Sequence, residues 1–165
     1  LAKFWVLALL LNYRRLSNCR IMKLFHGTAV SYNGSGILIL GPSGSGKSDL
    51  ALRLINEGAD LIADDQVLIK LVGKALQLSA PDSISGLIEV RGVGIIKIKP
   101  VCYIPLSLIV EIKSGAQLER IPIMKKDLIE EIPIPVIKLD AFEGSAIAKI
   151  KILLKCLGEE IELIQ

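Results

Sequence analysis

The chain has 165 residues, of which 52% are hydrophobic, 22% are charged and only 4% are aromatic, and its formal net charge is +3. This length suits one well-buried domain and is too short for two ordinary ones, and the composition excludes a disordered chain. The lysines and arginines are scattered, with no basic stripe interleaved with aromatic residues, which argues against nucleic-acid binding. The cysteines are far apart and form no C-x-x-C pair, which favours reduced thiols in the cytoplasm.

The first 21 residues differ from the rest of the chain. Residues 1–11 form an apolar run that is too short to span a bilayer comfortably, and Arg14 and Arg15 stand where a signal peptide would have its cleavage site. We expect the natural start at Met22, with residues 1–21 as an extension and residues 22–165 as the folded domain. The alternative for the extension is a helix on a membrane surface. No other segment is long and apolar enough to predict stable membrane insertion.

The predicted elements begin with a strand over residues 22–30. The dipeptide Asn33-Gly34 lies between apolar runs and predicts a hairpin turn into a buried strand over residues 36–40. A helix is predicted over residues 49–57, ending at Gly58. A short strand follows over residues 59–65 and ends in two aspartates.

The second half of the chain continues with a hairpin formed by residues 66–71 and 75–78. The β-rich residues 106–112 predict a central strand, whereas the prolines in residues 132–136 indicate an edge strand or a connector and exclude a central position. Helical periodicity over residues 146–157 predicts a closing helix. Together these elements predict an α/β fold with a mixed β-sheet and flanking helices.

A complete G-x-x-x-x-G-K-[ST] phosphate-binding loop joins the buried strand to the first helix, and it reads Gly41-Pro42-Ser43-Gly44-Ser45-Gly46-Lys47-Ser48. Its glycines allow backbone N–H groups to surround phosphate oxygens, and the helix N-terminus adds positive potential. Lys47 can reach the β- and γ-phosphates, and the Ser48 hydroxyl can ligate Mg²⁺. Because strand, loop and helix all match, the sequence predicts binding of ATP with Mg²⁺ over a chance glycine-rich turn.

The pair Asp64-Asp65 stands at the end of an apolar strand, where phosphate-loop proteins place a carboxylate for the metal. Two carboxylates allow one to serve the metal and the other to act as general base for an incoming hydroxyl. A solvated turn or a helix cap is the structural alternative. The chain has neither the Asn-Lys-x-Asp motif of GTPases nor the Leu-Ser-Gly-Gly signature of transporter ATPases, and both absences favour a kinase.

Four motifs in order give the chain a resemblance to a known family: Phe25-His26-Gly27, the phosphate loop, Ala63-Asp64-Asp65, and Glu89-Val90-Arg91-Gly92-Val93-Gly94. Together they resemble the catalytic domain of HPr kinase/phosphorylase, which phosphorylates a serine of the phosphocarrier protein HPr. The resemblance is strong over residues 22–99 and fades afterwards. It implies the P-loop fold of that domain, a cytoplasmic location, a role in phosphotransferase-system regulation and a hexameric habit.

The resemblance also implies roles for single residues. Lys47 and the loop amides would bind the triphosphate, and Ser48 would hold the metal with Asp65 and Glu89 as further ligands. Asp64 would activate the acceptor hydroxyl with help from Asp65, although the order of the two aspartates stays open. His26 would lie near the phosphates. Arg91 would neutralise charge, unless it and Glu89, two apart on one strand, form only an ion pair.

Two departures from the family pattern limit what the resemblance implies. The chain has no room for the N-terminal domain of the long members, and it resembles the short, catalytic-domain-only versions. Residues 136–144 lack the Gly-Arg-Asn stretch linked to phosphorolysis, so the kinase direction is better supported than the phosphorylase direction. The prediction is therefore an ATP- and Mg²⁺-dependent serine kinase acting on an HPr-like phosphocarrier. A small-molecule P-loop kinase and a non-catalytic ATP sensor are the alternatives.

Overall fold

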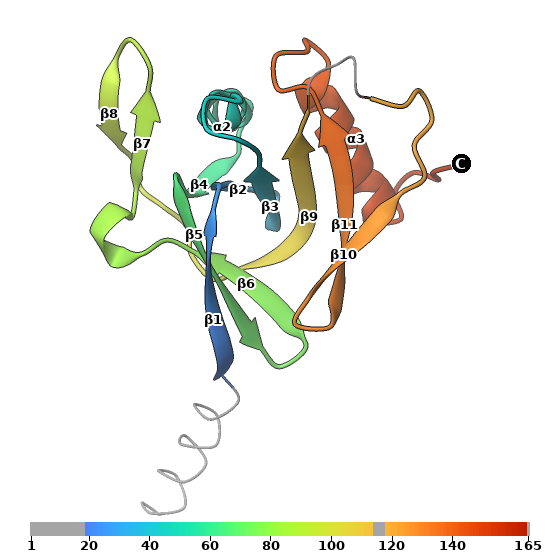
Figure 1. The fold of residues 1–165 in the computed structure, drawn as a ribbon, viewed down its shortest axis with the longest axis horizontal. Coiled ribbons are helices and arrows are strands. Elements are labelled where there is room, and N and C mark those ends of the chain that lie inside the picture. The colour runs from blue at the N-terminus through green and yellow to red at the C-terminus, as the bar shows by residue number, and fades with distance from the viewer. Residues whose placement is uncertain (1–18, 114–117, 165) are drawn as a thin grey trace, which may run out of the picture.

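A computed structural model describes residues 19–113 and 118–164 of the chain (Figure 1). The strands are β1 (Cys19–His26), β2 (Thr28–Tyr32), β3 (Ser35–Leu40), β4 (Asp60–Ala63), β5 (Gln66–Val72), β6 (Ala75–Ser79), β7 (Leu87–Val90), β8 (Gly94–Lys97), β9 (Ile104–Ile112), β10 (Lys125–Ile129) and β11 (Ile132–Leu139). The helices are α2 (Lys47–Asn56) and α3 (Ala146–Leu157), and a short 3₁₀ turn spans Asp82–Ile84. Residues 1–18 of the expected extension lie outside the described part, and residues 19–21 belong to β1.

Within the described residues, nine strands form one curled mixed sheet in the order β1-β5-β6-β9-β3-β2-β4, and β11 joins β9 and pairs with β10. β9 is central, because it runs parallel to β3 and to β11 and antiparallel to β6. β7 and β8 form a separate hairpin, which projects from the sheet beside α2 (Figure 1). The predicted α/β fold with a mixed sheet is confirmed.

Alternating residues of the central strands supply two cores on opposite faces of the sheet. On one face Ile37 and Ile39 of β3 and Val110 of β9 pack with the buried sides of α2 and α3. On the other face Leu38 and Ile109 pack with residues of β5 and β6, which curl over that face. This period of two is the pattern of strands buried on both faces. No helix among the described residues has the length and apolar character that crossing a bilayer requires.

The predicted strand over residues 22–30 is wrong in one respect, because the chain forms two strands there. β1 pairs with β5, whereas β2 pairs with β3 and β4. Gly27 stands at the break, and a Cβ atom added to it would lie 2.7 Å from the carbonyl oxygen of Ile39. The glycine therefore permits a close approach to β3 at which the chain passes from one part of the sheet to the next.

The structure confirms that the proline-containing part of residues 132–136 takes no central position in the sheet. β11 pairs with β10 along residues 132–136 and with β9 along residues 136–139, so Val136 is the residue that both registers share. Pro133 and Pro135 lie in the half that pairs with β10 alone, where a missing N–H group can face an open side. The prolines thus restrict one half of the strand, and the other half is free to join the central sheet.

Candidate active site

The phosphate loop connects the end of β3 to the start of α2. Gly44 and Gly46 have φ angles of 75° and 95°, which side chains rarely permit, and Gly46 immediately precedes the helix. No side chain in the described part of the chain caps this end of α2, so its first N–H groups point towards the loop without a side-chain partner there. The loop therefore has the backbone conformation and the free donors that binding of phosphate oxygens requires.

Lys47, the first residue of α2, is buried although it carries a charge. Its Nζ donates hydrogen bonds to the carbonyl oxygens of Gly41 (3.0 Å) and Pro42 (2.9 Å), so the side chain folds back across the loop. The ammonium group is thereby held on the inner side of the loop, where phosphates would lie. This arrangement lowers the conformational entropy that Lys47 would lose on binding an anion.

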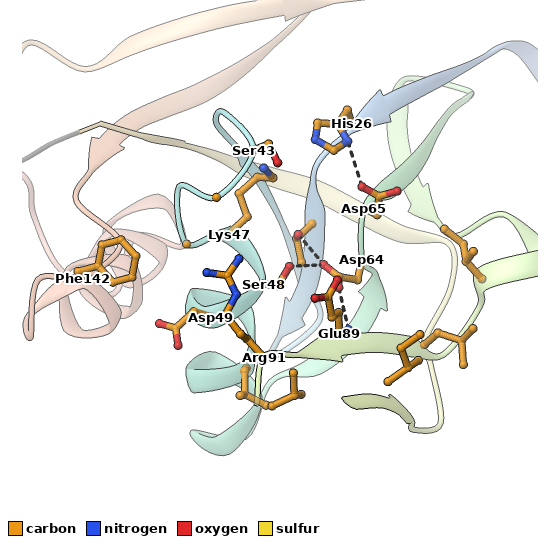
Figure 2. A pocket seen from close by; sticks show the side chains of 18 residues that line it. His26, Ser43, Lys47, Ser48, Asp49, Asp64, Asp65, Glu89, Arg91 and Phe142 are labelled. Carbon is orange, nitrogen blue, oxygen red and sulfur yellow. Dashed lines mark hydrogen bonds and ion pairs between the residues drawn. The ribbon is translucent and has the colours of Figure 1, made fainter. Parts of the chain in front are cut away.

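Asp64 lies at the end of β4 and connects three segments that are far apart in the sequence. Its Oδ1 accepts hydrogen bonds from the hydroxyls of Thr28 and Ser48, both at 2.8 Å, and its Oδ2 accepts one from the backbone N–H of Glu89 at 3.1 Å. The residue is 8% exposed. These three donors fix the carboxylate beside the first turn of α2 (Figure 2).

Asp65 has the opposite environment from Asp64. It occupies the turn between β4 and β5 with a φ of 69°, and its side chain is 68% exposed. Among the described residues this carboxylate pairs with His26 alone, whose Nδ1 lies 3.2 Å from its Oδ1. The backbone carbonyl of Asp65 accepts a hydrogen bond from the N–H of Gly27, so β1 and this turn are held together at the site.

Glu89 and Arg91 approach the loop from the β7–β8 hairpin. The expectation that both lie on one strand is wrong, because β7 ends at Val90 and Arg91 belongs to the turn that follows. No ion pair joins the two side chains in the described part of the chain. In Figure 2 the Arg91 side chain extends from the hairpin towards the phosphate loop.

A cavity of about 550 Å³ brings most of the predicted site residues together. Its wall includes predicted residues from all four motifs: His26, Ser43, Gly44, Gly46, Lys47, Ser48, Asp64, Asp65, Glu89 and Arg91. The predicted loop residues Gly41, Pro42 and Ser45 do not line it. The sequence analysis missed several wall residues, among them Thr28, Asp49 and Phe142. Thr28 and Asp49 adjoin predicted motifs, but Phe142 has no sequence signal beyond its rarity as one of three phenylalanines.

The residues present fit a triphosphate with Mg²⁺. The described residues contain no group of three or more His, Cys, Asp or Glu side chains that could hold a metal ion alone. Mg²⁺ in phosphate-transfer sites needs fewer protein ligands, since it keeps waters and binds one or two carboxylates together with substrate phosphates. The Ser48 hydroxyl and the Asp64 carboxylate provide hard oxygen ligands of this kind, next to the free donors of the loop.

A family model described as the HPr Serine kinase C-terminal domain matches residues 18–152. This chain belongs to that family. Among curated relatives, HPr kinase/phosphorylase of Clostridium tetani is 46% identical over 102 residues, covering 62% of this chain and 33% of the relative. The proteins of that name from Chlorobium limicola and Mycoplasmopsis pulmonis are 35% and 39% identical, each match covering 76% of this chain and 42% and 44% of the relative.

The HPr kinase domain of this chain thus spans less than half the length of the curated relatives it matches. A solved structure of the HPr(Ser) kinase/phosphatase from Coxiella burnetii superposes with a TM-score of 0.74 at 24% identity, covering 86% of this chain and 99% of that one. At this identity the superposition shows a shared fold. The family predicted from the four motifs is confirmed by the family model that matches residues 18–152.

Proposed function

We propose that this domain transfers the γ-phosphoryl group of ATP to a serine of an HPr-like phosphocarrier protein. The observation that carries the proposal is the 2.8 Å hydrogen bond from Ser48 to Asp64, which joins the phosphate loop to the acidic strand end inside one cavity. In a chance glycine-rich turn, nothing would require the serine after the lysine to form a hydrogen bond with a buried carboxylate. The names of the relatives support HPr as the partner.

In this proposal Lys47 and the backbone donors of the loop bind the phosphates. Ser48 and Asp64 would hold Mg²⁺, with the exposed Glu89 carboxylate as a further ligand on the same cavity wall. Mg²⁺ bound there would neutralise charge that develops on the phosphate oxygens. This assignment exchanges the roles expected for the two aspartates, because the three hydrogen bonds to Asp64 leave its carboxylate little freedom to meet an incoming hydroxyl.

Asp65 is the better candidate for the general base. Its carboxylate is exposed at the cavity wall, and His26 beside it can orient one oxygen and leave the other open to solvent. A base must come within hydrogen-bond reach of the serine hydroxyl, and an exposed side chain at the mouth of the cavity can meet a protein substrate. Arg91, which extends towards the loop, would offset negative charge during transfer.

The wider setting follows from the same proposal. ATP and a phosphocarrier meet in the cytoplasm, so the domain would act there in phosphotransferase-system regulation, and a hexamer is the assembly that the family resemblance suggests. Residues 136–144 lack the stretch linked to phosphorolysis, which supports transfer from ATP over the reverse reaction.

The experiment is transfer of labelled γ-phosphate from ATP and Mg²⁺ to an HPr-like protein of the host. Lys47→Ala should reduce transfer by about a hundredfold or more, since it removes a preorganised charge. Asp65→Asn should reduce transfer by about 10²- to 10⁴-fold while ATP binding persists. Lys126→Ala and Asp127→Asn, on the exposed strand β10, are matched controls that should leave transfer unchanged. Binding of ATP without transfer to any such carrier would contradict the kinase and favour an ATP sensor.

A further inference from the structure

Phe142 is an exposed aromatic residue at the edge of the phosphate loop. It lies in the turn between β11 and α3, is 70% exposed, and forms part of the cavity wall. A Cβ atom added to Gly46 would lie 2.9 Å from the tip of the Phe142 ring. The ring therefore touches the loop at the residue before Lys47, and much of its surface faces solvent.

The turn that carries Phe142 is fixed by several contacts. The backbone N–H of Phe142 donates to Oδ1 of Asp140 at 2.9 Å, and Ala141 between them is fully buried. The carbonyl oxygen of Ala141 accepts a hydrogen bond from Arg53 of α2. Glu143 accepts hydrogen bonds from Ser145 and from Lys149 of α3. The turn that carries the ring is thus held from both helices, so the position of Phe142 at the cavity is a feature of the fold.

The residues that line the cavity lie in a definite order along the phosphate loop. Figure 2 shows His26 and Asp65 at one end, Lys47 and Ser48 in the middle, and Phe142 beyond the loop at the other end. The carboxylate that would meet an acceptor hydroxyl marks the end where the transferred phosphoryl group lies. The rest of the nucleotide must extend the other way, towards Phe142.

The topology of the sheet supports the same orientation of the bound nucleotide. β3, β9 and β11 are parallel, so their carboxyl ends and the segments that follow them lie at one edge of the sheet. Ligands of open α/β sheets bind in the crevice outside the carboxyl ends of the strands. The phosphate loop follows β3 and the Phe142 turn follows β11, and these two segments enclose the same edge.

We infer that Phe142 is the surface on which the base of the bound nucleoside triphosphate stacks. This inference rests on the proposed function, because it needs a nucleotide on the phosphate loop. An aromatic face stacks on any base, since every base has a π-face, and stacking contributes enough to change affinity by about tenfold. Loss of the ring should therefore lower the affinities for ATP and GTP by similar factors and leave the affinity for inorganic triphosphate unchanged.

The test is calorimetric titration of ATP, GTP and inorganic triphosphate, each with Mg²⁺, into the full chain and its variants. Phe142→Leu keeps an apolar side chain without the π-face. It should lower the affinity for both nucleotides about tenfold and leave the affinity for inorganic triphosphate unchanged. Phe142→Trp should restore nucleotide affinity. Ile152→Ala removes another exposed apolar side chain, on α3, and should change no affinity.

The outcomes separate the inference from the proposed function. Equal ATP affinity of wild type and Phe142→Leu, with binding that Lys47→Ala still weakens, would overturn the stacking role and leave the proposed function standing. The same would follow if Phe142→Leu raised only the KM for the phosphocarrier, since the ring would then contact the protein substrate. Wild type that binds neither nucleotide nor triphosphate would overturn both.

Discussion

At the scale of single residues, two neighbouring aspartates have opposite surroundings. Asp64 is buried and accepts hydrogen bonds from three donors, whereas Asp65 is exposed and, among the described residues, pairs through its side chain with His26 alone. Sequence identifies both as candidates because they end an apolar strand near a phosphate loop. It cannot separate their roles, because the donors from Thr28 and Glu89 come from segments 36 and 25 residues away.

The contrast predicts different effects of the same substitution on stability. Asp64→Asn replaces one carboxylate oxygen with an NH₂ group, which must face a donor in either orientation, so the free energy of unfolding should fall by about 1–3 kcal/mol. Asp65→Asn should change it by no more than about 0.5 kcal/mol, because the site is exposed and Asn tolerates a positive φ. Urea denaturation of both variants measures the difference. Equal losses would contradict the buried network around Asp64.

At the scale of elements, the two helices are joined at their outer side by an ion pair. Lys151 of α3 donates to Oε2 of Glu57, the residue that follows α2, at 2.8 Å, and its Nζ also lies 5.0 Å from the centre of the Tyr32 ring. The hydrogen bond from Lys151 and then its charge lower the pKa of Glu57 below its ordinary value. The same contact raises the pKa of Lys151.

This pair predicts a dependence of stability on pH. Because the folded pKa of Glu57 is depressed, its contribution is present above the unfolded value of about 4.3 and is lost as the pH falls through the folded pKa. Wild type should therefore be slightly more stable than Glu57→Gln at pH 7, and the gap should close towards pH 3. Urea denaturation at several pH values measures it, with Glu119→Gln, also exposed, as the control. If the difference in stability between wild type and Glu57→Gln grew on acidification, the stabilising ion pair between Glu57 and Lys151 would be contradicted.

Local signals predicted several elements closely. The Asn33-Gly34 turn forms with φ angles of 51° and 78°, and α3 spans the predicted residues 146–157. The error at Gly27 concerns which strands pair, because alternation of apolar residues does not identify the partner of a strand. Phe142 escaped prediction for a similar reason, because its place beside Gly46 depends on the distant pairing of β9 with β11.

At the scale of the whole molecule, β1 extends two pairs beyond the expected start of the domain. Cys19 and Arg20 pair with Val72 and Leu71 of β5, and the remaining pairs run from Met22 to His26. A chain that begins at Met22 keeps the pairs next to the site. It should fold cooperatively, show the same affinity for ATP as is measured for the full chain, and lose about 1 kcal/mol of stability, since each cross-strand pair contributes a fraction of that.

Urea denaturation and ATP titration of residues 22–165 measure this outcome. A chain that begins at Gly27 is the control, because it removes β1 and His26 and should lose the cooperative transition. Failure of the chain that starts at Met22 to fold would show that the expected domain boundary is set too late.

The hydrogen bond from the Glu89 N–H group to Asp64 has a spectroscopic consequence. An amide proton that points at a carboxylate is deshielded, so its resonance responds to the charge which that carboxylate carries. Glu89 therefore gives the candidate site an internal NMR reporter on the backbone of a hairpin. Its signal would register a cation reaching Asp64 before any phosphate is transferred.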